Sequence, residues 1–136
     1  MSKAVSSELK TVYEPDLPWN RWKREPKAAN KETKEPADPG EERPVAERIR
    51  VTIAWPTIEE SARLSEAGGT QAIALAYAKR CIVGIENASV LKLDVSTGEE
   101  LLAIRSKKQR KAWQLAINVG SYVFNQSFMD EDEEKN

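Results

Sequence analysis

The most apolar part of the chain is the stretch TQAIALAYAKRCIVGIE, residues 70–86. Its alanines alternate with larger side chains such as Ile73, Leu75 and Tyr77. Alanine has the highest helix propensity, and its small side chain permits close approach of a neighbouring element. The stretch therefore predicts a central, mostly buried helix that ends near Gly84, with the alternative that residues 80–85 turn into a strand.

Residues 47–55 precede this helix and alternate between apolar and polar side chains. Such alternation predicts a half-buried strand, and Pro56 ends it because proline cannot donate to a β-ladder. Thr57 and Glu60 then have the spacing of a capping box, which predicts the start of a short helix. The inward-facing residues of the strand are expected to be Ile49, Val51, Ile53 and Trp55.

Three further elements are expected after the central helix. Residues 89–95 suit a short second strand or an extended loop, and Ser96 or Thr97 caps a helix that ends near Arg105. A last helix over about residues 107–127 carries an amphipathic stripe. These elements predict an α+β fold that is mainly α, a small helical domain with a minor two-strand β element. The stripe residues are Trp113, Ile117, Gly120, Phe124 and Phe128.

Charge and proline divide the chain into three parts. Residues 1–50 hold 11 basic and 10 acidic groups and six of the seven prolines. Segment 23–46 has too little apolar area to offset a backbone entropy of roughly 1–2 kcal/mol per residue. We therefore predict a disordered, charged, proline-rich leader over 1–46, one α-rich core domain over 47–128 and an acidic tail over 129–136. So small a core favours a homo-oligomer as additional support.

Composition excludes several function classes. The chain has no histidine and one cysteine, Cys81, so it lacks Ser-His-Asp and Cys-His nucleophile pairs, an intramolecular disulfide and a Cys-rich zinc site. Paired carboxylates at 59–60 and 99–100 are best explained as helix caps. The first residues lack the apolar core of a signal peptide, so we expect no secretion, and no apolar run of about 18 residues occurs. We expect a non-enzymatic cytoplasmic protein without cofactor, metal or membrane segment.

A basic run over residues 105–111 is the first candidate binding site. It holds five positive charges and no negative one. It is interpreted as a solvated loop and helix face, as a site for an acidic partner or for the chain's own acidic tail, or, least favoured, as a nucleic-acid site. The five acids at 130–134 would compete with phosphate for it. Its residues are Arg105, Lys107, Lys108, Arg110 and Lys111.

Aromatic residues supply the other candidates. Trp19 and Trp22 lie in polar surroundings, so they are either anchors for a partner or cover for the core. The stripe residues Trp113, Ile117, Phe124 and Phe128 either line a groove for a partner or pack in the core, and core packing is the commoner use of such a stripe.

The chain resembles the tail assembly chaperones of long-tailed bacteriophages over about residues 48–136. The resemblance rests on CIVGIEN at 81–87, on LDVSTGEELL at 93–102, and on the order of the elements from Trp55-Pro56-Thr57 to the acidic end. It implies a small helical protein without catalytic residues. Its partners would be the tape measure protein, which it keeps soluble, and the tail tube subunits that later displace it.

The resemblance also implies a possible frameshift, since many of these proteins have a longer form made by a −1 shift. Glu134-Lys135-Asn136 can be encoded GAA AAA AAC, which contains the slippery heptamer A AAA AAC. The alternative function is a structural virion protein (a connector, tail terminator or capsid accessory subunit) whose charged arm orders on assembly. A nucleic-acid-binding regulator is a third, weaker possibility.

Overall fold

The structure is a computed structural model that describes the backbone of residues 9–135 and the side chains of residues 9–127. It confirms the predicted fold class, α+β and mainly α. The strands are β1 (Lys10–Tyr13), β2 (Trp22–Arg24), β3 (Glu41–Glu42), β4 (Arg50–Ala54) and β5 (Ile82–Glu86). The helices are α2 (Pro18–Arg21), α3 (Ile58–Leu64), α4 (Thr70–Cys81), α5 (Gly98–Leu102) and α6 (Gln109–Lys135). Single 3-10 turns lie at Val45–Glu47, Ser65–Ala67 and Ala88–Leu91.

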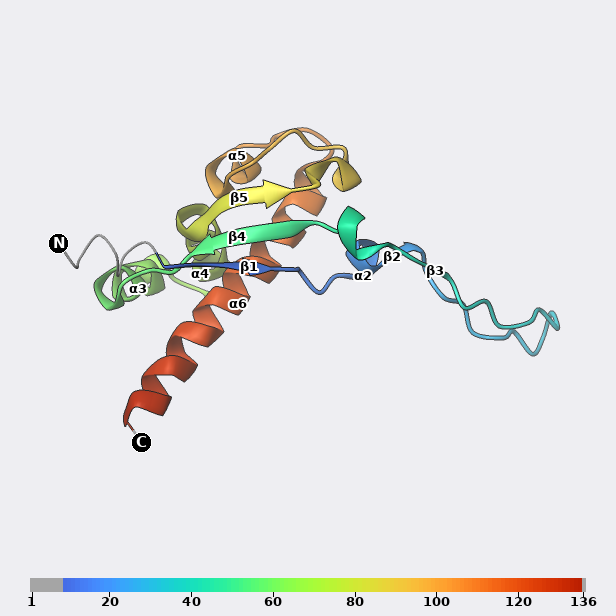
Figure 1. Cartoon of the computed structure of the whole chain (residues 1–136), viewed down its shortest axis with the longest axis horizontal. Helices are drawn as coiled ribbons and strands as arrows, with labels where there is room; N and C mark the ends of the chain where they lie inside the picture. Colours follow the sequence, from blue (N-terminus) through green and yellow to red (C-terminus); the bar gives the residue numbers. More distant parts are fainter. Residues whose placement is uncertain (1–8, 136) are drawn as a thin grey trace.

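One antiparallel sheet, in the order β1-β4-β5, forms the β layer, and α4 and α6 cover one of its faces (Figure 1). Ile49, Val51 and Ile53 are fully buried, as the alternating pattern predicts. They meet one long face of α6, and Tyr77 of α4 completes the same core. The inward-facing residues of α6 are Ala112, Leu115, Ala116, Val119 and Val123.

The β element is larger than the two strands that the sequence predicts. The second strand is residues 82–86, the alternative that the central stretch left open, and the central helix ends at Cys81. The predicted strand or loop at 89–95 begins instead as a 3-10 turn between Asn87 and Lys92, both in the left-handed conformation. The third strand, β1, comes from the predicted leader.

The leader prediction needs a correction, because residues 9–21 are part of the folded body. Tyr13 of β1 stacks on Tyr122 of α6 with ring centroids 3.9 Å apart, and its hydroxyl donates to Asn118 at 3.2 Å. Buried Asn20 accepts a hydrogen bond from the amide of Ile49 at 2.7 Å, and its Nδ2 donates to the carbonyls of Pro15 and Ile49. These specific contacts outweigh the polar composition of the segment.

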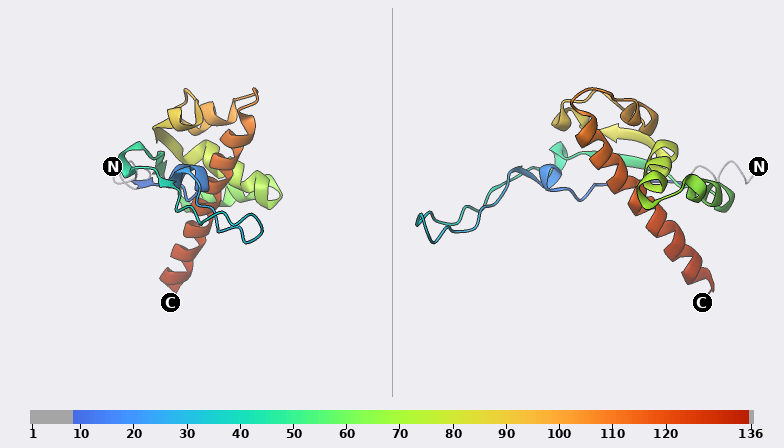
Figure 2. Two further views of the ribbon diagram at one scale, coloured as in Figure 1. Left: turned by 90° about the vertical axis from the view of Figure 1, so that its right-hand side faces the viewer. Right: turned by 180° about the vertical axis from the view of Figure 1, so that it is seen from behind.

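Residues 22–42 form a paired arm that projects from the body (Figures 1 and 2). Its two sides are joined by β2 and β3 and by isolated bridges at Lys27–Asp38 and Asn30–Glu35. At the tip, Asn30 Oδ1 accepts hydrogen bonds from the backbone amides of Glu32 and Thr33. Most of the arm is exposed, so it contributes little to the core, as its composition predicts. Its backbone is nevertheless paired.

The two central helices cross at very short range. A Cβ placed on Gly120 of α6 would lie 1.8 Å from the carbonyl oxygen of Ala74 in α4. One turn further along α4, a Cβ on Gly98 of α5 would lie 2.2 Å from the carbonyl oxygen of Ala78. The alanine-rich sequence of α4 predicts close approach of a neighbouring element, and the structure confirms it. Both α5 and α6 pack directly on the backbone of α4.

Candidate partner-binding site

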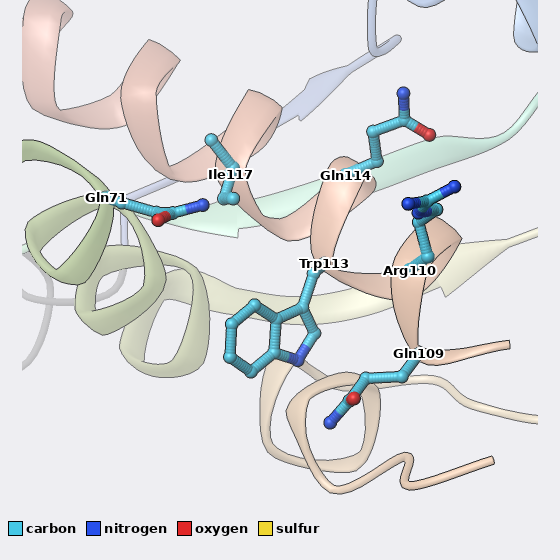
Figure 3. A pocket seen from close by; sticks show the side chains of 6 residues that line it. All are labelled: Gln71, Gln109, Arg110, Trp113, Gln114 and Ile117. Atoms are coloured by element: carbon cyan, nitrogen blue, oxygen red, sulfur yellow. The ribbon is translucent and has the colours of Figure 1, made fainter. Parts of the chain in front are cut away.

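A depression of about 390 Å³ lies between the first turn of α4 and the first three turns of α6. Trp113 and Ile117, one turn apart on α6, supply its apolar floor, and Gln71 reaches toward Ile117 from α4 (Figure 3). The remaining lining residues are all polar and all belong to α6. They are Gln109, Arg110 and Gln114.

This arrangement suits a peptide more than a small charged ligand. An apolar floor with amides at its rim can take apolar side chains while the amides bind the polar groups beside them. Arg110 adds one positive charge at the rim, which favours an acidic residue next to the apolar anchors. The side chain Nε1 of Trp113 is buried and has no acceptor among the described residues, so packing alone holds the ring.

The structure divides the predicted stripe on α6. Trp113 and Ile117 line the depression, and Gly120 lies at the crossing with α4. Phe124 packs edge-on against Tyr77, with ring centroids 5.6 Å apart, and so joins the core. Phe128 belongs to α6, but its side chain lies outside the described residues.

The basic run is also divided. Arg105 donates to the carbonyls of Leu102 and Ile104, at 2.6 Å and 3.1 Å, which caps the end of α5. Lys108 donates to the carbonyl of Lys92 at 2.6 Å and so fastens the loop after β5 to the start of α6. These two side chains therefore stabilise the fold.

The other three basic residues are available to a partner. Arg110 lines the depression, and Lys107 and Lys111 are exposed without an ion pair to any described carboxylate. The course of the α6 backbone argues against pairing with the chain's own acidic tail within one molecule. Since α6 is continuous to Lys135, Lys111 and Asp130 lie about 28 Å apart along it, at about 1.5 Å per residue.

The two N-terminal tryptophans have different environments. Trp19 packs against the core, which is the fold-back interpretation, and its backbone carbonyl accepts from Arg43 at 3.3 Å. Trp22 is half-buried at the base of the arm, opposite Glu42, with the guanidinium of Arg21 5.3 Å from its ring centroid. Neither of them lines the depression formed by α4 and α6.

Sequence reasoning missed the three glutamines of the site. Glutamine carries no motif, and only the helical spacing relates Gln114 to the residues one turn away, Arg110 and Ile117. Gln71 could not be placed without the crossing of α4 and α6. In the described part of the chain no cluster of His, Cys, Asp or Glu could hold a metal, and no helix is long and apolar enough to cross a membrane.

The chain matches no known family model, no curated protein and no solved structure.

Proposed function

We propose that this protein is a phage tail assembly chaperone that binds and solubilises the tape measure protein in the host cytoplasm, without catalysis or a cofactor. One observation carries the proposal: the apolar floor of Trp113 and Ile117 lies open beside amide side chains of α4 and α6. An amphipathic helix presents apolar residues at a spacing of three or four positions to such a floor.

The size of the depression fits a chaperone that must later be displaced. Its volume, about 390 Å³, is near the lower end of the range for ligand pockets, roughly 300–1,000 Å³. Each copy therefore binds few side chains, and many copies on one long helix supply the total affinity. Tail tube subunits can then replace the copies one at a time.

The test is coexpression with the tape measure protein of the same tail, measuring the soluble fraction of that protein. Trp113→Ala and Ile117→Ser are expected to abolish solubilisation. The matched control is Ile58→Ser, the same kind of change on α3 at a side chain that is 69% exposed and outside the depression. The proposal fails if the wild-type chain gives no soluble tape measure protein, or if the floor variants keep full activity with an unchanged melting curve.

The gene gives a second test. The proposal is strengthened if codons 134–136 read GAA AAA AAC and the −1 frame stays open downstream. If other codons are found, the proposal holds only for a chaperone that is made without a frameshift.

The arm favours a second candidate, a structural virion protein. A two-stranded ladder without a buried face is marginally stable by itself, so a neighbouring subunit would stabilise it. Its bridges at Lys27–Asp38 and Asn30–Glu35 already fix the pairing that such a neighbour would bind. Mass spectrometry of purified particles distinguishes the two functions, because a virion subunit is present in stoichiometric amount and a chaperone is absent.

A further inference from the structure

Strand β1 has an unpaired edge that presents backbone groups to solvent. It is the last strand in the order β1-β4-β5, and its register pairs Thr11 with Ile53. The amide of Trp55 donates to the carbonyl of Leu9, so the odd-numbered residues of β1 exchange hydrogen bonds with β4. Because these bonds alternate along an antiparallel pair, the amides and carbonyls of Lys10, Val12 and Glu14 point away from β4, toward the open edge of the sheet.

This edge has only partial protection against pairing, from its short length and from the charge of Lys10. No proline or bulge interrupts β1, and Val12, in its middle, is 66% exposed. Among the described residues, β4 is the only strand that pairs with β1. An edge of this kind is a template for another strand.

The charges along the edge select the added strand. Glu14 and Glu42 both pair with Arg48, at 3.1 Å and 2.9 Å, so this cluster has one negative charge in excess. At the other end of the strand, Lys10 has no ion pair with a described carboxylate. The edge therefore has a positive end and a negative end, which is self-complementary in an antiparallel arrangement.

We propose that two copies of this chain pair through their β1 edges, antiparallel and with Val12 opposite Val12 on the two-fold axis. This register places Lys10 of each copy opposite Glu14 of the other, beside the Arg48 cluster with its excess negative charge. A register centred on Lys10 or on Glu14 would oppose like charges, which destabilises a cross-strand pair. A shift toward the next residue, Pro15, would place a proline in the ladder.

The dimer has one continuous sheet in the order β5-β4-β1-β1-β4-β5. Since the two-fold axis is perpendicular to an antiparallel sheet, α4 and α6 of both copies cover the same face. The two α4/α6 depressions then lie on the same side of the continuous sheet. The inference rests on the β1 edge and the charges beside it, and it does not depend on what the depression binds.

The first test compares Val12→Pro with Val12→Thr in the full chain, using light scattering after size exclusion and sedimentation equilibrium. Proline removes an amide that points outward, so the bonds from β1 to β4 stay intact, and threonine keeps both the amide and the strand propensity. We expect a wild-type dimer, a Val12→Thr dimer, and a dissociation constant at least about 100-fold higher for Val12→Pro, because the central reciprocal hydrogen bonds are lost.

Charge exchange provides the second test. Lys10→Glu and Glu14→Lys are each expected to raise the dissociation constant about tenfold, because both symmetry-related pairs become repulsive. The variant that carries both substitutions should regain most of the wild-type affinity, since opposite charges would again face each other across the axis. Melting curves of every variant establish that it is folded.

Two results overturn the proposal. A wild-type chain that stays monomeric at high concentration excludes a self-pairing edge and leaves the edge to a different chain. A dimer that survives Val12→Pro, or whose affinity the double charge exchange does not restore, uses another surface. Neither result bears on the solubilisation assay, so this proposal and the proposed function fail independently.

Discussion

Replacing Gly120 with alanine separates close helix packing from helix propensity, because the two act in opposite directions. The added Cβ would lie 1.8 Å from the carbonyl oxygen of Ala74 and 2.6 Å from its carbonyl carbon. An ordinary contact begins near 3.4 Å, so α6 and α4 must separate by roughly 1.5 Å at the crossing. The atoms in the way are backbone atoms of α4, which cannot rotate aside.

The expected loss follows from these distances. Overpacking in a core costs about 1–3 kcal/mol, and a backbone clash of this depth belongs at the upper end. Alanine returns about 1 kcal/mol of helix propensity relative to glycine. Gly120→Ala should therefore lower the free energy of unfolding by about 2 kcal/mol, or the melting temperature by about 8 °C at about 4 °C per kcal/mol.

The assay is urea unfolding followed by tryptophan fluorescence, with linear extrapolation to water. The neighbouring variant Ser121→Ala is the control, since it also raises helix propensity on α6 but lies beside the crossing rather than in it. We expect it to change stability by less than about 0.5 kcal/mol. A Gly120→Ala protein that is about 1 kcal/mol more stable than wild type, as propensity alone predicts, would refute the close crossing.

Three further substitutions test other parts of the structure. Asn20→Ala leaves the buried amide of Ile49 without its acceptor and should cost about 2–3 kcal/mol in urea unfolding; an unchanged midpoint would contradict the role of this side chain. The hydrogen bond from Arg80, at 2.6 Å, lowers the pKa of the Glu60 carboxyl below its ordinary value of 4.5. The ionised carboxylate therefore stabilises the folded protein above pH 4.5, and this stabilisation is lost as the pH falls through the lowered pKa of the folded state. Glu60→Gln should remove that acid dependence together with about 0.5–1 kcal/mol, because the partly exposed ion pair with Arg80 is lost while the glutamine oxygen still accepts from the Thr57 amide in the capping box. Burial raises the pKa of Cys81 to about 12 from 9.0, so the folded thiol stays neutral, stability falls as the pH rises from 9 toward 12, and Cys81→Ala flattens this fall. In the native protein at pH 8 we expect the Cys81 thiol to react with a disulfide reagent only as fast as the chain unfolds; immediate labelling would show that it is exposed.

Local chemistry was the part of the fold that sequence reasoning predicted well. The capping box of Thr57 and Glu60 is present in full, and the alternation at 49–53 buries the expected side chains. Both signals depend on residues within a few positions of one another. The hydroxyl of Thr97 caps α5 for the same reason.

Pairing between segments far apart in the sequence could not be predicted from composition. Strand β1 is short and mixed in polarity, and it is recognisable only when β4 provides its register and Tyr122 its stacking partner. The candidate site shows the same limit. The stripe on α6 was recognised, but only the crossing at Gly120 decides that Trp113 and Ile117 stay open while Phe124 enters the core.

The length of α6 separates opposite charges along one axis and so contributes an electric dipole moment to the molecule. Basic side chains gather where the helix begins and the acids at 130–134 lie near its far end, so their separation adds to the aligned peptide dipoles instead of opposing them. The net charge is only −1, so a distant charged partner attracts or repels the protein as a whole only weakly. The field of that partner acts on the dipole and exerts a torque that orients the protein. Encounter with a charged surface should therefore be oriented. That orientation should weaken as salt shortens the Debye length below about 10 Å, even where the overall attraction hardly changes.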